Sequence, residues 1–188
     1  ILSAISAANQ QIRYGADVIH RIVESTRPGG SEALQRAIVE ETINPMIRYM
    51  CREAKVPTSA VCRLSVASNT TMNHLFAGIY ADPIRTEPYV PAFFETSPIP
   101  AVMVGVEANN NARIVMAPNI GSYVGGDITA GVLVTQMWNS PEMTLFVDLG
   151  TNGELVFGNQ DFMMSCACSA GPAFEGGEIV CGMRAANG

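Results

Sequence analysis

The amino-acid sequence predicts an α/β fold with mixed sheets and flanking helices. Amphipathic helical stripes open the chain, and short runs rich in β-branched residues alternate with turn residues and further helices after them. The 188 residues are 48% hydrophobic and 15% charged, which is enough apolar material for one or two compact cores. This composition excludes disorder, collagen and a coiled coil.

Charge and cysteine usage limit the partners and the compartment. The 17 acidic and 11 basic residues give a net charge of -6, which repels a phosphate backbone, so no nucleic-acid partner is expected. No apolar run approaches the roughly 18–20 residues that cross a bilayer, so no membrane partner is expected. Five irregularly spaced cysteines fit a cytoplasmic location. Because the chain starts at Ile1 without a methionine, it is expected to be a piece of a longer protein.

Two helices are expected at the start. Apolar residues recur at spacings of three and four from Ile12 to Val23, with charged residues opposite. Pro28-Gly29-Gly30 breaks this helix, and Ser31 is the expected N-cap of the next. The second stripe runs from Leu34 to Met50, with a kink expected at Pro45.

A strand, a polar turn and a short helix come next. Val61 to Ala67 has the composition of a strand. Ser68-Asn69-Thr70-Thr71 then offers caps to a helix that runs through Phe76. The N–H groups at a helix start also attract anions, so a simple cap and an anion site both remain open here.

The middle of the chain is expected to be extended. Five prolines between Asp82 and Pro100 favour an irregular connection with at most one edge strand. Strands are expected at Ala101 to Glu107 and Ala112 to Met116. After a glycine-rich turn, Asp127 is expected to cap a helix that ends near Trp138, or to lie near a magnesium-bound water.

The last third is the most informative part. Met143 to Asp148 and Glu154 to Phe157 are strand patterns around Leu149 to Gly153, and an Asn-Gly pair between apolar runs predicts a hairpin. Phe162 to Ala167 fits a third strand. A glycine-rich turn after an acidic strand end can cradle phosphate oxygens, with Asp148 holding the hydration shell of magnesium. A tight hairpin without a ligand explains the same residues.

The remaining reactive side chains favour plain structural roles. Cys166, Cys168 and Cys181 fall short of the four ligands of a zinc site, so buried, inert thiols are expected. His20 and His74 are far apart in sequence, without an acid at ligand spacing, and are expected to be surface or satisfied helix residues.

Several segments together match the pattern of a known family. They are Tyr14–Ile19, Asn69–Met72, Glu87–Tyr89, Gly125–Asp127, Asp148–Glu154, Ser169–Gly176 and Gly182–Ala185. These segments resemble the ATPase domain of the reductive activators of corrinoid proteins. That family is similar to the acetate kinase, sugar kinase, heat-shock and actin superfamily, so the resemblance implies a partial actin-like (ribonuclease H-like) ATPase domain. One position departs from the family pattern, because Ser68 stands where glycine is expected.

The resemblance also implies a domain organisation and an activity. Residues 1–140 would be mostly the first lobe and an insertion, and residues 141–188 the start of the second lobe with its phosphate hairpin. An N-terminal [2Fe-2S] domain and a first phosphate hairpin belong to complete members and are not visible here. The implied task is to return a Co(II) corrinoid protein to Co(I), using ATP and Mg²⁺ to drive electron transfer. The fragment alone is expected to be inactive.

The resemblance implies the following partners and site residues. The partners are a corrinoid protein of a methyltransferase system and an electron donor to the parent, and a homodimer is a further expectation because truncation exposes sheet edges. The alternatives are a small-molecule kinase or phosphotransferase of the same superfamily, and a nonenzymatic module that docks on a corrinoid protein. The implied residues are Asp148 and Glu175 for catalysis, Asp148 for magnesium through water, Gly150, Thr151, Asn152 and Gly153 for ATP phosphates, and Ser169, Ala170 and Gly171 for corrinoid or partner contact.

Overall fold

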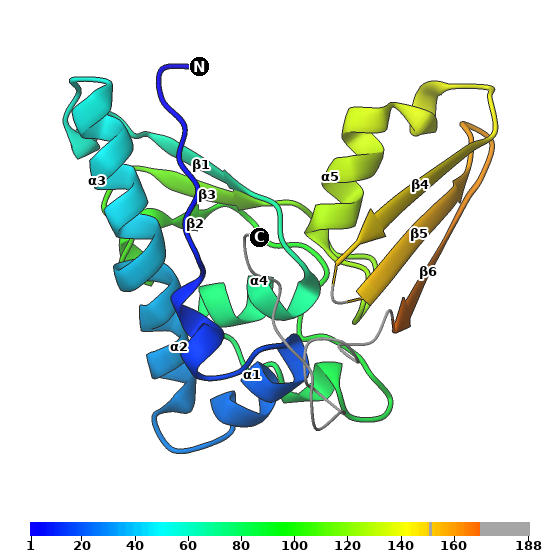
Figure 1. Cartoon of the computed structure of the whole chain (residues 1–188), viewed down its shortest axis with the longest axis horizontal. Coiled ribbons are helices and arrows are strands. Elements are labelled where there is room, and N and C mark those ends of the chain that lie inside the picture. The colour runs from blue at the N-terminus through cyan, green and yellow to red at the C-terminus, as the bar shows by residue number, and fades with distance from the viewer. Residues whose placement is uncertain (151, 170–188) are drawn as a thin grey trace, which may run out of the picture. The chain divides into compact units, whose positions relative to one another are not determined.

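The computed structural model describes residues 1–150 and 152–169, and these divide into two compact units (Figure 1). The first unit, Ile1–Ala130, contains a three-stranded sheet and most of the helices. The second unit begins at Gly131 and contains a three-stranded antiparallel sheet. The mixed α/β class expected from the sequence is confirmed. No helix in the described ranges is long and apolar enough to cross a membrane.

The first helical stripe forms two separate elements. Ile12 lies in the 3₁₀ helix η1 (Gln10–Arg13), and α1 spans Val18–Ser25. The expectation of one helix from residue 12 is wrong because Asp17 takes the N-cap position, where its Oδ1 accepts from the backbone N–H of His20 at 2.9 Å. Partial burial raises the pKa of Asp17, but hydrogen bonds from His20 outweigh this and hold that pKa below its ordinary value.

The second stripe forms one long helical run with a wider turn in its middle. It consists of α2 (Gly30–Ile38), the π-helical segment η2 (Val39–Ile43) and α3 (Asn44–Glu53). The irregularity expected at Pro45 falls just before it, because proline has no N–H to donate to the carbonyl one turn earlier. Gly29, with φ 74°, is the N-cap in place of the expected Ser31.

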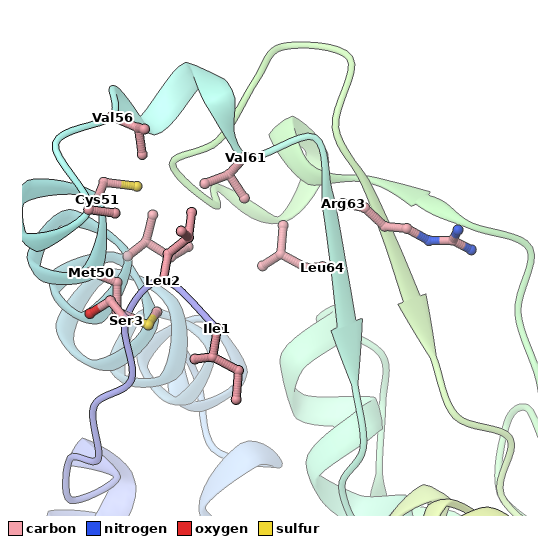
Figure 2. Close-up of a pocket in the computed structure, with 11 residues that line it drawn as sticks. Ile1, Leu2, Ser3, Met50, Cys51, Val56, Val61, Arg63 and Leu64 are labelled. Carbon is pink, nitrogen blue, oxygen red and sulfur yellow. The ribbon is translucent and has the colours of Figure 1, made fainter.

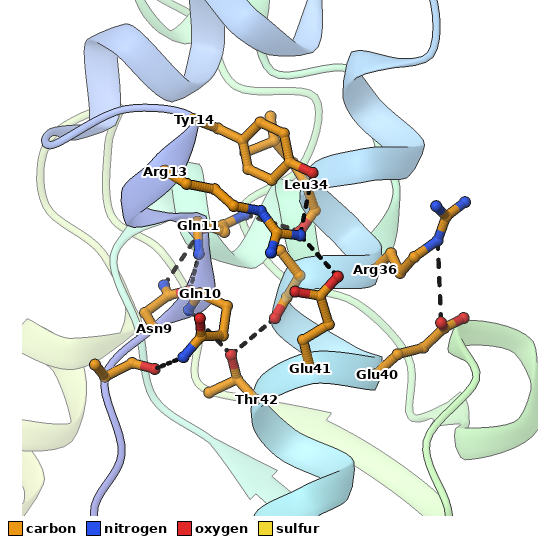
Figure 3. Close-up of polar contacts among 12 residues, drawn as sticks. Asn9, Gln10, Gln11, Arg13, Tyr14, Leu34, Arg36, Glu40, Glu41 and Thr42 are labelled. Atoms are coloured by element: carbon orange, nitrogen blue, oxygen red, sulfur yellow. Dashed lines mark hydrogen bonds and ion pairs between the residues drawn. The ribbon is translucent and has the colours of Figure 1, made fainter.

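Side-chain contacts attach η1 to this long run (Figure 3). The buried Gln11 donates from Nε2 to the carbonyl of Leu34 at 3.1 Å. Arg13 Nη2 lies 2.7 Å from Glu41 Oε1. An amide buried without a partner would be costly, so the Gln11 bond fixes the register of the N-terminal segment against α2.

The sheet of the first unit has the order β1-β3-β2. Strand β1 (Arg63–Val66) runs parallel to β3 (Arg113–Met116), and β2 (Ile99–Pro100) runs antiparallel to β3. The strand expected at 101–107 is wrong, because Ala101–Val104 forms the 3₁₀ helix η5, which Gly105 ends at φ 79°. A continuous apolar run does not distinguish strand from helix by periodicity.

Helix α4 (Thr70–Ala77) follows β1 and packs into the core of this unit. Asn69 caps it by accepting from the N–H of Met72 at 2.8 Å. Two short 3₁₀ helices, η3 (Thr58–Ala60) and η4 (Asp82–Ile84), complete the connections. The largest fully buried apolar side chains of the unit are Ile22, Leu34, Leu75, Ile84, Ile114 and Ile128.

Gly125 allows two segments to approach closely at the start of α4. A Cβ at this position would lie 2.5 Å from both Asn69 Cα and Thr70 N, which are backbone atoms that cannot swing away. We therefore expect Gly125→Ala to lower the free energy of unfolding by about 2 kcal/mol, measured by urea denaturation. The control is Gly121→Ala, where a Cβ meets nothing within 4 Å; equal losses in both variants would contradict this account.

The second unit contains a meander of three strands. They are β4 (Thr144–Leu149), β5 (Asn152–Gly158) and β6 (Met163–Ser169), in the order β4-β5-β6. The hairpin and the third strand expected from the sequence are confirmed. Helix α5 (Gly126–Thr135) ends before the expected Trp138, because Gln136 adopts φ 57° and the 3₁₀ helix η6 (Met137–Asn139) follows.

The two faces of this sheet differ. Gly131 of α5 packs against one face, where a Cβ on it would lie 2.3 Å from the ring of Phe146. The other face is apolar and open, since Leu145, Leu149 and Met164 are 58%, 81% and 63% exposed. Strand alternation and register place Val147 and Phe157 on this open face too.

The open face predicts self-association of the isolated chain. We expect Val147→Lys combined with Leu149→Lys to shift the chain toward monomer in sedimentation velocity, because charges on an exposed apolar face oppose its burial. A Val102→Lys variant is the control, since Val102 is 66% exposed but belongs to the first unit. If the wild-type chain is monomeric at all concentrations, the homodimer expectation fails.

Candidate functional site

The turn between β4 and β5 is a tight one. Leu149 pairs with Gly153, and the N–H of Gly150 donates to the carbonyl of Asn152 at 2.9 Å. That donor is therefore used within the turn, while a Cβ on Gly150 would meet nothing closer than 3.8 Å. Thr151 lies outside the described residues. The Asn-Gly pair expected to form the turn instead begins β5.

Two carboxylates face each other across this hairpin. Asp148 pairs directly with Glu154 in the β4–β5 register, so both side chains lie on the same face of the sheet. Asp148 is half-buried and makes no hydrogen bond or ion pair with any described residue. Carboxylate oxygens are the ligands that Mg²⁺ prefers, so the Asp148 side chain fits the hydration shell of a divalent cation.

Glu154 is a site candidate that sequence reasoning missed. It was part of the hairpin motif but was given no role, because the spacing of Asp148 and Glu154 alone does not tell which residues pair. The antiparallel register supplies that information. A two-strand alignment with the turn centred on residue 151 would have found it.

The third strand is joined directly to the turn residues. Asn152 pairs with Ser169, and Gly153 pairs with Cys168. The Cys168 thiol donates to the carbonyl of Gly153 at 3.2 Å. Hence Asp148, Gly150, Asn152 and Gly153 lie at one end of the sheet, next to the backbone of Ser169. The other expected residues Ala170, Gly171 and Glu175 lie outside the described residues.

The polar residues at the start of α4 are occupied with each other. Ser68 Oγ donates to Asn73 Oδ1 at 2.7 Å, and Asn73 Nδ2 donates to Asn119 Oδ1 at 2.8 Å. Thr70 Oγ1 donates to the carbonyl of Gly121 at 2.6 Å. Ser68, which replaces the expected glycine, thus contributes a hydroxyl to this cluster. These bonds favour the cap interpretation of residues 69–71 over an anion site.

Asp127 lies within the first turn of α5 rather than before it. Its backbone N–H donates to the carbonyl of Ser68 at 3.2 Å, and its Oδ1 accepts from the N–H of Ile128 at 2.9 Å. A carboxylate at this position is favourable because it faces the positive end of the helix dipole. Asp127 therefore serves the helix start.

The two histidines have different environments. His20 is exposed and its Nδ1 lies 2.7 Å from Asp17 Oδ2, so the expectation that it has no acid nearby is wrong. His74 is fully buried, and its Nδ1–H donates to the carbonyl of Thr70 at 2.7 Å while Nε2 accepts from the N–H of Ala92 at 3.1 Å. It is the satisfied helix histidine that the sequence predicts.

The cysteines form no metal centre in the part of the chain that the structure describes, where no group of three or more candidate ligands occurs. The expectation of buried thiols is wrong for Cys166 and Cys168, which are exposed on β6. They are exposed because β6 is the edge strand of the sheet, and all of residues 163–168 are exposed. Cys181 lies outside the described residues.

A pocket of about 460 Å³ lies between α3 and β1 (Figure 2). Its walls are almost wholly apolar, with Met50 and Cys51 on α3 and Val61 and Leu64 on the opposite side. It has no carboxylate to hold magnesium, and the side chain of Arg63, its one charged lining residue, points away from the apolar residues (Figure 2). The candidate site is therefore the β4–β5 turn and not this pocket.

Two features of the described hairpin residues suit ATP and magnesium. The half-buried Asp148 carboxylate has no described partner and faces Glu154, which suits a hydrated Mg²⁺ ion. The open space over Gly150 leaves the turn accessible to a phosphate group. The described residues of the hairpin thus leave room for magnesium and a phosphate group.

Two family models match this chain, and they identify the class of protein to which it belongs. Residues 142–188 match a family model described as the C-terminal domain of RACo, the ASKHA domain. The second unit thus begins a domain of the actin-like class. Residues 1–140 match the model described as the RACo middle region. The chain belongs to the RACo family.

Individual relatives agree with this assignment. The chain is 30% identical over its whole length to "Corrinoid activation enzyme RamQ" of Eubacterium limosum, and 28% identical over 85% of its length to "[Co(II) methylated amine-specific corrinoid protein] reductase" of Methanosarcina barkeri. A solved structure, "Reductive activator for corrinoid,iron-sulfur protein", is 49% identical, with a TM-score of 0.84 over 96% of this chain. The chain spans only 31%, 30% and 29% of these three proteins, respectively.

Proposed function

We propose that the parent protein is an ATP-dependent reductive activator that returns a Co(II) corrinoid protein to Co(I). The observation that carries the proposal is the agreement between the family assignment and the hairpin. The chain belongs to the RACo family, and its half-buried Asp148, which has no described partner, lies near the end of β4 just before the β4–β5 turn. The names of the relatives refer to the activation or reduction of corrinoid proteins.

Each hairpin residue has a defined role in this proposal. Asp148 holds the waters around Mg²⁺, and Glu154 adds negative charge on the same face. Gly150 keeps the turn open to the phosphates, with Thr151, Asn152 and Gly153 completing it. Bound ATP with magnesium supplies the free energy for the uphill electron transfer. Glu175 orients the attacking water.

The partner contact is assigned to the end of β6 and the residues that follow it in the sequence. Ser169, Ala170 and Gly171 are small residues that let another molecule approach closely, and Ser169 offers its hydroxyl oxygen to the corrinoid. The electron reaches the cobalt from a [2Fe-2S] domain of the parent, which an external donor reduces. The corrinoid protein is the substrate, and it belongs to a methyltransferase system.

We divide the chain into two lobes at the boundary between the two matched family models. Residues 1–140 contribute mostly to the first lobe and its insertion, and residues 141–188 begin the second lobe. The boundary between the matched family models, at residues 140 and 142, supports this division. We expect residues 1–188 alone to be inactive, because the described residues include a single candidate phosphate hairpin.

The proposal is tested by following cobalt reduction in the full-length parent. The Co(II) corrinoid protein is mixed with reduced parent, and Co(I) formation is recorded by absorbance with and without MgATP. Reduction that requires ATP supports an activator. Phosphate transfer to a small acceptor without the corrinoid protein supports a kinase, and corrinoid-protein binding without ATP dependence supports a docking module; either result contradicts the proposal.

A further inference from the structure

Three sulfur-bearing side chains lie in a row on the edge strand of the second unit. Met164, Cys166 and Cys168 occupy alternate positions of β6, which is the outer strand of the β4-β5-β6 sheet (Figure 1). Because successive side chains of a strand point to opposite faces, these three share one face of the sheet. All three are exposed, and both cysteines are free thiols.

The spacing along the strand decides which chemistry the two thiols can perform together. Residues two apart on a strand are separated by about 6.7 Å. A disulfide needs Cβ atoms about 3.5–4.5 Å apart, so Cys166 and Cys168 cannot form one without bending β6. An ion bound to both sulfurs, with metal–thiolate bonds of about 2.3 Å, spans about 4.6 Å between them, which two side chains leaning together reach. The pair therefore suits a bridging ion better than a disulfide.

The neighbouring strand leaves these sulfurs free to bind. Cys168 pairs with Gly153, which has no side chain, and the sulfur lies 3.1 Å from the place that a Cβ on Gly153 would take. Its hydrogen bond to the Gly153 carbonyl, at 3.2 Å, is that of a weak donor. The Cys166 thiol makes no hydrogen bond with a described residue. Little is therefore lost when an ion replaces the thiol protons.

Two thiolates and a thioether select a soft ion. Sulfur ligands from Cys and Met favour Cu(I), whereas Mg²⁺ and Ca²⁺ prefer oxygen. A structural zinc site takes four ligands, and the described residues contain no group of three or more His, Cys, Asp or Glu that could hold a metal. Cu(I) is stable with two sulfur ligands, so it needs only the pair that β6 presents.

We propose that Cys166 and Cys168 form a binding site for a soft metal ion of the Cu(I) class, with Met164 as a third, weaker ligand. One Cu⁺ replaces the two thiol protons, which are released to water, and the dithiolate complex carries one net negative charge. The hydrogen bond from Cys168 to Gly153 is lost in this step, because the thiolate has no proton to donate. This inference does not depend on the function proposed above.

The test is an anaerobic titration of the 188-residue chain with Cu(I), in competition with the chromogenic chelator bicinchoninate. We expect Cys166→Ser and Cys168→Ser each to weaken Cu(I) binding at least about 100-fold, because a hydroxyl is a poor ligand for a soft ion. Met164→Leu should weaken it by about threefold or more. The matched control is Cys62→Ser, which removes an exposed thiol of the first unit and should stay within about twofold of wild type.

A second readout follows from the released protons. The Cu(I) affinity of wild type should fall as the pH is lowered, because protons compete with the ion for both sulfurs. Equal affinity in wild type and in both serine variants overturns the inference, and so does an equal loss in Cys62→Ser. A loss in only one of the two serine variants also overturns it, because the site would then use a single thiolate. If a serine variant does not fold, the corresponding alanine variant decides by the same criterion.

Discussion

Replacing Asp148 by asparagine should lower the rate of ATP hydrolysis by the full-length parent about 100-fold or more. The substitution keeps the size and the position of the side chain but removes the negative charge that would hold a hydrated magnesium ion. Because Asp148 has no described partner to lose, the variant should unfold at nearly the wild-type temperature. The measurement is steady-state phosphate release with saturating MgATP.

The matched control for Asp148 is Asp161→Asn. Asp161 is also an aspartate of the second unit, but it lies in the turn between β5 and β6, at the opposite end of the sheet from the β4–β5 turn. It is exposed and should keep full activity. Activity of Asp148→Asn within about twofold of wild type would show that the hairpin is only a turn.

Truncating His74 should cause the largest loss of stability in the first unit. The ring is fully buried, bonds Thr70 and Ala92, and stacks on Phe93 at a centroid distance of 4.2 Å. His74→Ala leaves the Ala92 N–H without its acceptor and opens a cavity, for an expected cost of about 3–5 kcal/mol in urea unfolding. His20→Ala is the exposed control, and a similar loss there would contradict this account.

The same histidine makes stability depend on pH. Burial lowers the pKa of His74 from its ordinary value of 6.5, although the hydrogen bond to Thr70 opposes this. The unfolded chain therefore binds a proton at a higher pH than the folded chain does. Stability from this group is complete above pH 6.5 and falls as the pH drops below 6.5 toward the lower folded pKa, with a slope of at most about 1.4 kcal/mol per pH unit.

A His74→Phe variant isolates this effect. It keeps an aromatic ring but cannot titrate, so its free energy of unfolding should be flatter than that of wild type between pH 6.5 and pH 5. An unchanged slope in the variant would mean that groups other than His74 control the pH dependence in this range.

Local sequence patterns predict the helices and strands that depend mainly on interactions between residues close in sequence. The β4–β5–β6 meander follows from strand alternation and a glycine-rich turn, and α4 follows from the cap at Asn69. The division of the first helix was missed because Asp17 fits a helical stripe equally well as a polar face residue. The helix at 101–104 was missed because an apolar run has no periodicity of its own.

Only part of the candidate site can be predicted from the sequence, because some of its contacts depend on how the strands pair. Asp148 and the glycines are contiguous in sequence, so the motif identifies them. The role of Glu154 and the contact between Cys168 and Gly153 depend on strand register, which is fixed by pairing across the sheet. Sequence spacing of 15 residues between Cys168 and Gly153 gives no sign of that contact.

The most direct test of the central claim is ATP hydrolysis by the full-length parent with and without its corrinoid protein, repeated with Asp148→Ala. We expect the corrinoid protein to stimulate hydrolysis, and we expect the Asp148→Ala protein to lose both the basal and the stimulated rate. Hydrolysis that ignores the corrinoid protein and survives Asp148→Ala would contradict both the activator function and the site at the β4–β5 turn.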